Sequence, residues 1–338
     1  MSLQLVEGFD HITTADPQSK GWSRNFAYNT GRFGTGQCWD CTNREAIKTL
    51  PGSFATLYVG AACKYRSTAD GTVFFQLLDS GTVHMVAMYN WPTQEFRVYR
   101  GLNVTQLGSS YLKPLYIGQW YYIEFTATIS DTVGVVELKI DGTSVIGPLT
   151  SQDTRNGANS TANQLRIGQD VNSNSPFDID DLYVLDSGGS SPTNTYLGDI
   201  KVETLYPNGN GNSSVLLNDG GNTTNNYTHV DETFPNGDTD YVESSTVGDK
   251  DTYAYTNMAT TAGTVFGVQI NPYAKKTDAG TRSIKTVARV STTEVDGPVQ
   301  TLGASYAYLT DIRETKPGGG AWTISDVNGA EFGVKVNA

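Results

Sequence analysis

Three carboxylates stand close together in FDIDDLYVLD, the stretch from residue 177 to 186. Asp178, Asp180 and Asp181 directly precede an apolar run, so the chemistry open to them is metal binding or acid–base catalysis. Alternation along a strand places Asp178 and Asp180 on one face and Asp181 on the other, together with Tyr183. Calcium takes about six to eight oxygen ligands, so loop carbonyls would have to complete a site here. The pattern favours the solvated start of a strand, and a calcium site is the alternative.

The cysteines Cys38 and Cys41 form a C-x-x-C motif, and Cys63 is the third cysteine of the chain. Such a motif can supply half of a zinc site or a redox pair. A zinc site would need further ligands, and the histidines do not stand at ligand spacing. They are His11, His84 and His229. Buried, reduced thiols are therefore the favoured interpretation.

The aromatic cluster QWYYIEF, at 119 to 125, could line a sugar-binding face, because tyrosine and tryptophan rings combine an apolar body with a polar group. Alternation along a strand divides it into two sets, Trp120, Tyr122 and Glu124 against Tyr121, Ile123 and Phe125. One set belongs to the core. For the set that carries Glu124, core or interface packing is favoured over a glycan-binding site.

The elements that position these residues are expected to be strands. The chain has 338 residues, 38% of them hydrophobic, which is enough for two domains with separate cores. Its 36 Gly and 19 Tyr against 4 Met are typical of proteins built from short strands and tight turns. We therefore expect an all-β protein.

Charge and hydropathy exclude two classes of partner. The net charge is −12, and the 23 basic residues are scattered, so no basic stripe offers itself to a nucleic acid. No apolar run approaches the roughly 18 residues of a membrane span. The start, MSLQLVEGFD, lacks the pattern of a signal peptide, and we expect synthesis and folding in a cytoplasm.

The first half contains six β-rich runs separated by turn signals such as DSGT and IDGTSV. The expected strands cover 54 to 65, 72 to 79, 82 to 90, 95 to 101, 120 to 130 and 134 to 142. This spacing predicts an antiparallel meander that closes as a sandwich or jelly roll over residues 1 to 187.

A polar Gly, Ser and Pro stretch at 188 to 198 is typical of a linker, so the second domain is expected at 199 to 338. It should be a smaller β-sandwich, with strands at 251 to 258, 264 to 276, 283 to 290, 305 to 314 and 330 to 337. Residues 207 to 232 are rich in Asn and Gly and predict a long loop or arm. A short helix is expected near 321 to 329, where Thr323 can cap it.

The first half resembles a known family on the residues EGFDHI, Trp22, GQWYYIEFTATIS, GVVELKIDG and FDIDDLYVLD. Together they are similar to the laminin-G-like, concanavalin-A-like jelly-roll domain of tailed-bacteriophage virion proteins, over about residues 3 to 187. The second half is similar to a C-terminal module of the same proteins. The resemblance implies a virion component, and it leaves open whether the protein lies in the head or the tail.

Enzymes also use this fold, so an enzymatic function would require catalytic residues at a defined spacing. Retaining glycosidases of this fold use E-x-D-x-x-E to hold two carboxylates about 5 Å apart. The nearest stretch, TEVDGP at 293 to 298, lacks the third carboxylate and contains a turn signal. A lyase needs a positioned base, and His84 has no visible partner. We expect no catalytic residue, no metal, no cofactor and no enzymatic activity.

These observations predict a non-enzymatic structural protein of a tailed-phage virion, a capsid decoration or tail accessory protein that contacts the major capsid or tail protein. The alternative is a module that recognises host-surface glycans, and a polysaccharide-degrading enzyme is the remote one. The polar arm predicts a homo-oligomer, with a trimer as the expected state, because a partner surface would offset the entropy of ordering it.

Overall fold

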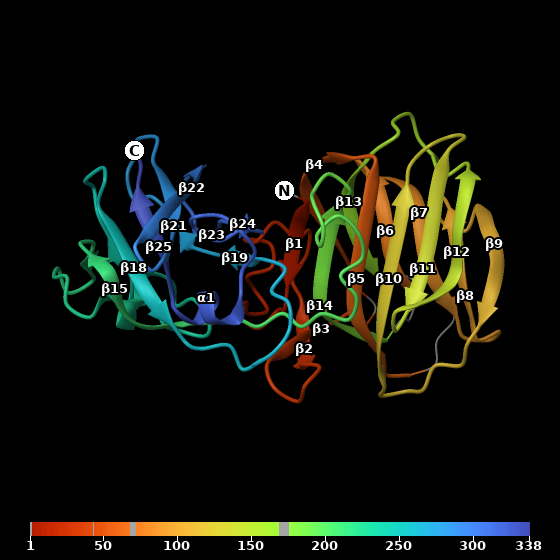
Figure 1. The fold of residues 1–338 in the computed structure, drawn as a ribbon, viewed down its shortest axis with the longest axis horizontal. Helices are drawn as coiled ribbons and strands as arrows, with labels where there is room; N and C mark the ends of the chain where they lie inside the picture. The colour runs from red at the N-terminus through yellow and green to blue at the C-terminus, as the bar shows by residue number, and fades with distance from the viewer. Residues whose placement is uncertain (1, 43, 68–71, 169–175) are drawn as a thin grey trace. The chain divides into compact units, whose positions relative to one another are not determined.

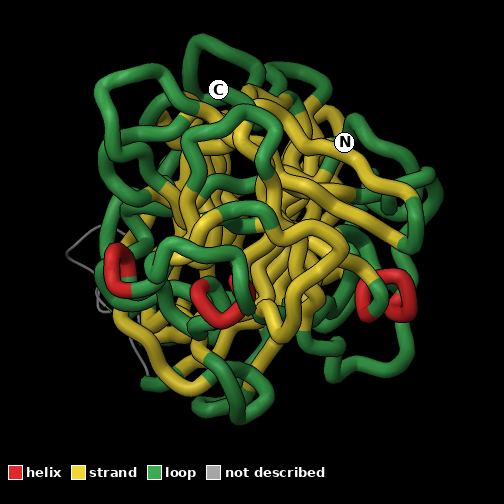
Figure 2. The backbone as a smooth tube through the Cα atoms, turned by 90° about the vertical axis from the view of Figure 1, so that its left-hand side faces the viewer, coloured by secondary structure: helices red, strands yellow, loops and turns green. Residues whose placement is uncertain are grey.

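The computed structural model describes residues 2–42, 44–67, 72–168 and 176–338. It divides into two compact units, Met1–Val202 and Glu203–Ala338. Strands and loops make up nearly all of the backbone (Figure 2). The expected fold class is confirmed, an all-β chain with a jelly-roll sandwich followed by a smaller β domain. Within the described residues, no helix has the length and apolar character needed to cross a membrane.

The first unit is a sandwich of two antiparallel sheets, whose two layers of strands are visible in Figure 1. The eight-stranded sheet runs in the order β12 (Thr143–Gln152), β11 (Gly134–Ile140), β10 (Trp120–Thr128), β5 (Thr56–Tyr65), β14 (Phe177–Asp186), β3 (Gln37–Asp40) and β2 (Ala27–Thr30), with β1 (Leu3–Glu7) also paired to β14. The six-stranded sheet runs in the order β4 (Glu45–Phe54), β13 (Ala162–Gly168), β6 (Thr72–Asp79), β7 (Thr82–Asn90), β8 (Glu95–Arg100) and β9 (Thr105–Leu112).

Tight hairpins fix the register of both sheets. Ser80 and Gly81 join β6 to β7 with φ of 47° and 93°, and Asp141 and Gly142 join β11 to β12 with φ of 51° and 75°. Two consecutive residues with positive φ are the signature of a turn whose twist matches that of the strands. The turn signals DSGT and IDGTSV therefore predicted these hairpins correctly.

Aromatic side chains fill the space between the two sheets. Phe74 of β6 lies 6.0 Å from Tyr65 of β5 and 5.6 Å from Phe177 of β14, between ring centroids, so it joins the two layers. Its ring also stacks on Phe96 of the same sheet. All four side chains are buried, and burial of rings of this size is the main stabilising term of such a core.

The second unit is organised around one five-stranded antiparallel sheet with three short ladders beside it. The sheet order is β15 (Pro207–Ser214), β18 (Lys250–Tyr255), β25 (Ala330–Val336), β21 (Ser283–Val290) and β22 (Thr293–Thr301). The ladders pair β16 (Leu217–Asn218) with β17 (Val242–Glu243), β19 (Val268–Ile270) with β24 (Asp311–Arg313), and β20 (Tyr273–Ala274) with β23 (Ala307–Tyr308).

The expected short helix is confirmed as α1 (Ile324–Asn328). Thr323 caps it and forms a reciprocal capping box with Asp326. Val327 of this helix packs with Trp322 and Phe332 in the core of the second unit. The capping residues thus place one apolar side chain of a five-residue helix against the sheet.

Three expectations about the connections are wrong. Residues 188–198 belong to the first unit, because their backbone and Tyr196 make hydrogen bonds to its sheet, and the division falls between Val202 and Glu203. The supposed arm begins with strand β15, whose backbone pairs with β18 despite its Asn and Gly content. The turn expected in TEVDGP is an irregularity inside strand β22.

The rest of the supposed arm is ordered by side-chain hydrogen bonds. It contains the single-turn helix η1 (Asn226–His229), and a second single-turn helix, η2 (Gly237–Thr239), follows just beyond its end. The buried carboxylate of Asp251 accepts hydrogen bonds from the backbone of Val215 and Leu216 and from Asn226 Nδ2. Polar groups therefore substitute for the apolar side chains that this segment lacks.

Candidate functional site

A β-bulge places the acidic residues of β14 differently from simple alternation. Asp181 has φ of 52°, and the pairing with β5 shifts between Asp180, opposite Ala62, and Tyr183, opposite Gly60. Because Ala62 and Gly60 share one face of β5, Asp180 and Tyr183 also share a face. The expectation that Asp178 and Asp180 lie on the face opposite Tyr183 is therefore wrong, since one extra residue in the strand reverses the alternation.

Asp178 is a buried ion-pair partner. Its carboxylate lies 3.0 Å from Lys64 Nζ and 2.9 Å from Arg66 Nε, and Asn29 Nδ2 donates to it at 2.8 Å. The side chain itself is inaccessible to solvent, so the expectation of a solvated strand start is wrong at this position. Two cations and an amide donor account for the charge of this carboxylate.

Asp180 and Asp181 are also buried, and both accept hydrogen bonds. Asp180 accepts the backbone N–H of Arg32 and of Asp181, each at 2.8 Å, while Asp181 accepts that of Val202 and pairs with Arg32 at 3.3 Å. Burial raises the pKa of Asp180, and the charge of Asp181 raises it further. Burial likewise raises the pKa of Asp181. The oxygens are thus directed at N–H donors, and the calcium alternative finds no converging ligand set in them.

The face that carries Tyr122 and Glu124 is packed. Glu124 is 1% exposed and accepts hydrogen bonds from the Tyr183 hydroxyl at 2.5 Å and from the Gly198 N–H at 2.9 Å. Tyr122 is buried, and its hydroxyl donates to the carbonyl of Asp181. Trp120 is half-buried beneath Lys64. Packing rather than sugar stacking is therefore confirmed for Tyr122 and Glu124.

Two of the three histidines lie inside the first unit. His84 is buried, and its Nδ1 accepts the backbone N–H of Asn156 at 2.9 Å. His11 lies 2.6 Å from Lys20 Nζ, which pairs at 2.7 Å with buried Glu7. Burial and the charge of Lys20 lower the pKa of His11 to about 3, so its ring is neutral. Both histidines belong to the packing of the sandwich.

The expectation of buried thiols is confirmed. Cys38, Cys41 and Cys63 are all buried free thiols. Burial raises the pKa of each, to about 12 for Cys38. A thiol is a weak nucleophile until it ionises, so burial disfavours the reactive form of both thiols in the C-x-x-C motif.

Partly exposed aromatic rings gather instead in the second unit. Tyr273 and Tyr308 are partners in the ladder of β20 and β23, with ring centroids 4.7 Å apart. Tyr306 stacks on Tyr273 at 5.0 Å with an angle of 8° between the rings. All three are half-buried. We call Tyr273, Tyr306 and Tyr308 the tyrosine cluster.

Charged groups border the tyrosine cluster. Lys275 Nζ lies 4.6 Å from the ring centroid of Tyr306, a cation–π distance. The carboxylate of Asp238, whose side chain is 69% exposed, pairs with Lys275 at 2.6 Å and accepts the Tyr306 hydroxyl at 3.0 Å. Ring faces, an ammonium and a carboxylate therefore meet at one half-open place on the second unit.

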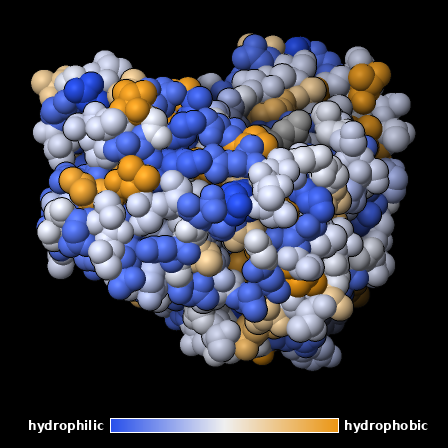
Figure 3. Space-filling view, turned by 60° about the vertical axis from the view of Figure 1, so that its left-hand side comes forward, coloured by the Kyte–Doolittle hydropathy of each residue, from blue (hydrophilic) through white to orange (hydrophobic). Residues whose placement is uncertain are grey.

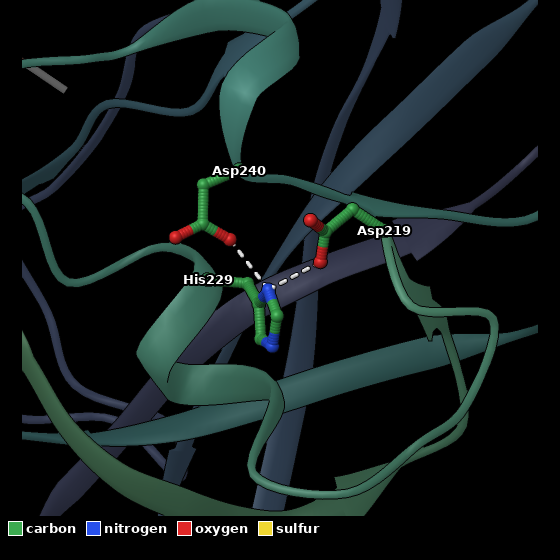
Figure 4. Close-up of side chains that lie close together, drawn as sticks. All are labelled: Asp219, His229 and Asp240. Atoms are coloured by element: carbon green, nitrogen blue, oxygen red, sulfur yellow. Dashed lines mark ion pairs between the residues drawn. The ribbon is translucent and has the colours of Figure 1, made fainter.

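The turn η2 carries Asp238 to this cluster and Asp240 to a second group of polar side chains. There, His229 Nδ1 lies 2.7 Å from Asp219 Oδ1 and 2.5 Å from Asp240 Oδ1 (Figure 4). Among the described residues, this is the one group of three His, Cys, Asp or Glu side chains whose ligand atoms all lie within 4.8 Å of one another.

Sequence reasoning missed both groups in the second unit. Tyr273 lies 33 and 35 positions from Tyr306 and Tyr308, and the short ladder of β20 and β23 brings it beside them. His229 does not stand at zinc-ligand spacing in the sequence, and the two carboxylates that the fold brings to it, Asp219 and Asp240, lie ten and eleven positions away. The signal was present in the aromatic stretches NPYAKK and SYAY, but it needs the pairing of those strands to be recognised.

The exposed surface offers no broad apolar area on the face drawn in Figure 3, where hydrophobic residues appear as small separate patches among hydrophilic ones. Broad exposed apolar patches mark protein or membrane interfaces. A half-polar site such as the tyrosine cluster suits a hydroxyl-rich ligand better than an apolar one.

The sequence matches no protein-family model, and no curated protein matches it either. Solved structures match with low scores. A Trypanosoma rangeli sialidase mutant is 15% identical, with a TM-score of 0.34 over 48% of this chain and 27% of that one. A galectin of Caenorhabditis elegans is 8% identical, with a TM-score of 0.30 over 41% of this chain and 88% of the galectin. A carbohydrate-binding module of Bacillus subtilis is 10% identical, with a TM-score of 0.30 over 49% of this chain and 91% of the module. The match thus spans about a quarter of the sialidase, and likenesses at these scores carry no argument about activity or ligand.

Proposed function

We propose that this protein is a non-enzymatic binding protein whose ligand is a glycan of a bacterial surface. The observation that carries the proposal is the tyrosine cluster with Lys275 and Asp238 beside it. Tyrosine rings pack on the apolar C–H faces of sugar rings, while an ammonium and a carboxylate form hydrogen bonds with hydroxyls. We therefore place the glycan site in the second unit and not in the jelly roll, where Tyr122 and Glu124 are buried and cannot contact a ligand.

The non-enzymatic part of the proposal rests on the state of the candidate catalytic groups. Glu124 is bonded to Tyr183 and Gly198, and His84 accepts a backbone N–H, each in a place that solvent does not reach. A general acid or base must reach the proton that it transfers. The virion setting, head or tail, and its capsid or tail partners stay predictions from the sequence resemblance.

The test is a screen of the full chain against immobilised bacterial polysaccharides, followed by titration calorimetry with each one bound. Tyr306→Ala removes the stacked ring and the hydrogen bond to Asp238, and we expect its affinity to fall about tenfold, or about 1.4 kcal/mol. Tyr116→Ala is the matched control, since Tyr116 is 68% exposed and lies in the first unit.

The milder variant Asp238→Asn guards against misfolding, since its exposed side chain carries little packing. It should weaken binding while the circular dichroism spectrum stays unchanged. If the wild type, Tyr306→Ala and Asp238→Asn bind a polysaccharide with equal affinity, the tyrosine cluster is not the glycan-binding site. If the protein binds none of the polysaccharides, the proposal that its ligand is a glycan is wrong.

A further inference from the structure

His229 occupies an unusual position between two carboxylates. Its Nδ1 points at Asp219 and Asp240 together, while Nε2 points away from both (Figure 4). An imidazole nitrogen carries at most one proton, and one N–H cannot align with two oxygens at 2.7 and 2.5 Å. In agreement, His229 Nδ1 and Asp240 Oδ1 are both buried, and neither takes part in a contact that meets the geometry of a hydrogen bond.

The surrounding charge does not balance these carboxylates. Several other acidic residues of the second unit are paired with lysine or arginine, for example Asp278 with Arg282 and Asp326 with Lys316. Among the described residues, Asp219 and Asp240 have ion pairs with His229 alone.

We propose that Asp219, His229 and Asp240 bind a divalent transition-metal cation of the Zn²⁺ class. One imidazole nitrogen and two carboxylate oxygens are a ligand set that zinc accepts, with the fourth position left to water or to another oxygen. Calcium and magnesium prefer oxygen ligands alone, so the imidazole selects against them. With metal–ligand distances of about 2.0–2.2 Å, a tetrahedral site places neighbouring ligand atoms about 3.3–3.6 Å apart. The two contacts of His229 Nδ1, now 2.7 and 2.5 Å, must therefore lengthen by roughly 0.6–1 Å when the ion enters.

The position of the three ligands in the chain gives the ion a structural task. Asp219 follows β16, His229 ends η1 and Asp240 follows η2, so one ion would join three separate turns of a segment rich in Asn and Gly. Asn226 is the one buried residue of η1, and η2 has none. A metal that binds only the folded chain therefore replaces the apolar contacts that fasten ordinary loops.

The experiment uses full-length, tag-free protein freed of metal with EDTA and then dialysed. Titration calorimetry with ZnCl₂ should show one site per chain, and the melting temperature should rise with zinc. CaCl₂ and MgCl₂ at the same concentration should bind more weakly. Removing one ligand, in His229→Ala or Asp240→Asn, should weaken zinc binding more than tenfold.

Asp278→Asn is the control, because Asp278 is an exposed carboxylate of the same unit that pairs with Arg282. It should bind zinc as the wild type does. If His229→Ala does not fold, Asp219→Asn provides the same test with an isosteric side chain. Absence of zinc binding by the wild type, or equal binding by the wild type and the ligand variants, would overturn the proposal. Tighter binding of calcium than of zinc would overturn the choice of metal.

Discussion

The hydroxyl of Tyr183 donates a 2.5 Å hydrogen bond to Oε1 of Glu124, and neither side chain is more than 1% exposed. The ring of Tyr183 lies against Gly60, where an added Cβ would fall 2.2 Å from ring atom Cε1. Glycine at this position thus makes room for the ring, and the ring delivers a donor to a buried carboxylate. Burial raises the pKa of Glu124, and this hydrogen bond limits the rise.

Tyr183→Phe should destabilise the first unit by about 1–3 kcal/mol, because it leaves a buried carboxylate with one donor fewer. In the variant, Glu124 keeps the hydrogen bond that the Gly198 N–H donates to it. Urea unfolding followed by tryptophan fluorescence measures the change, with exposed Tyr116→Phe as the control. An unchanged midpoint for Tyr183→Phe would show that Glu124 is already protonated or hydrated.

The pair Asp180 and Asp181 should make stability depend on pH. A carboxyl group whose pKa is raised in the folded state keeps its proton where the unfolded chain loses it. Its stabilising contribution is therefore complete below the usual aspartate pKa of about 4 and is lost as pH rises through the raised value. The free energy of unfolding of the first unit should fall in that window by up to about 1.4 kcal/mol per pH unit and per proton.

Asp180→Asn removes one of these titrating groups, so the fall should be shallower in the variant than in the wild type. Urea midpoints at intervals from pH 4 to pH 8 give both slopes. Asp10 and Arg32 also face this pair and are unchanged in the variant. Parallel slopes would mean that Asp180 stays ionised across the whole range.

How far the sequence predicts this fold depends on where the strand signal lies. Apolar runs identified β5, β6, β7, β10 and β11, because most of the side chains on each of these strands are buried in the core. This apolar signal missed β15 (PNGNGNSS), which has no fully buried residue. It also missed β22 (TEVDGPVQT) at the sheet edge, where a D-G-P irregularity resembles a turn.

The candidate site residues could not be predicted from the sequence for a different reason. A single bulge at Asp181 reversed the faces of β14, and no local pattern announces such a bulge. The linker interpretation of 188–198 used composition alone, whereas Tyr196 and the Gly198 N–H bond to groups on β11 and β10 that are far away in sequence. The tyrosine cluster and the His229 group both depend on long-range pairing of short segments.

Buried Lys20 and Glu7 form an ion pair of 2.7 Å in which both side chains are at most 1% exposed. Lys20→Met should cost about 3–5 kcal/mol, because the carboxylate of Glu7 stays buried without its cation. The double variant Glu7→Gln with Lys20→Met should recover part of that loss, which thermal unfolding of all three variants measures. A double variant as unstable as the sum of the single ones would contradict a direct coupling.

No polysaccharide should be shortened by this protein. A panel of bacterial polysaccharides incubated with the full chain should keep its size distribution in gel filtration, since Glu124 and His84 are out of reach of a substrate. Chain shortening that His84→Ala or Glu124→Gln abolishes would show the opposite. Shortening that persists in both variants would point to a contaminating enzyme.

Asp251 should control the order of the segment that follows β15. Its carboxylate is inaccessible and accepts from Val215, Leu216, Asn226 and the Tyr253 hydroxyl. Asp251→Asn turns one acceptor into a donor that faces other donors, so the second unit should lose about 3 kcal/mol. Hydrogen exchange should accelerate at 215–230, whereas Asp278→Asn should leave it unchanged.

The same variant separates local order from assembly. The homo-oligomer, with a trimer as the expected state, was inferred from a polar arm that needed a partner, but Asp251 satisfies part of that segment from within the unit. Deleting 207–232 would also remove strand β15, so Asp251→Asn is the cleaner perturbation. Light scattering should give an oligomer for the wild type and a smaller species for Asp251→Asn if the segment contacts a neighbouring subunit. An oligomer of the same mass in both would place the contact elsewhere, and a monomeric wild type would refute the oligomer.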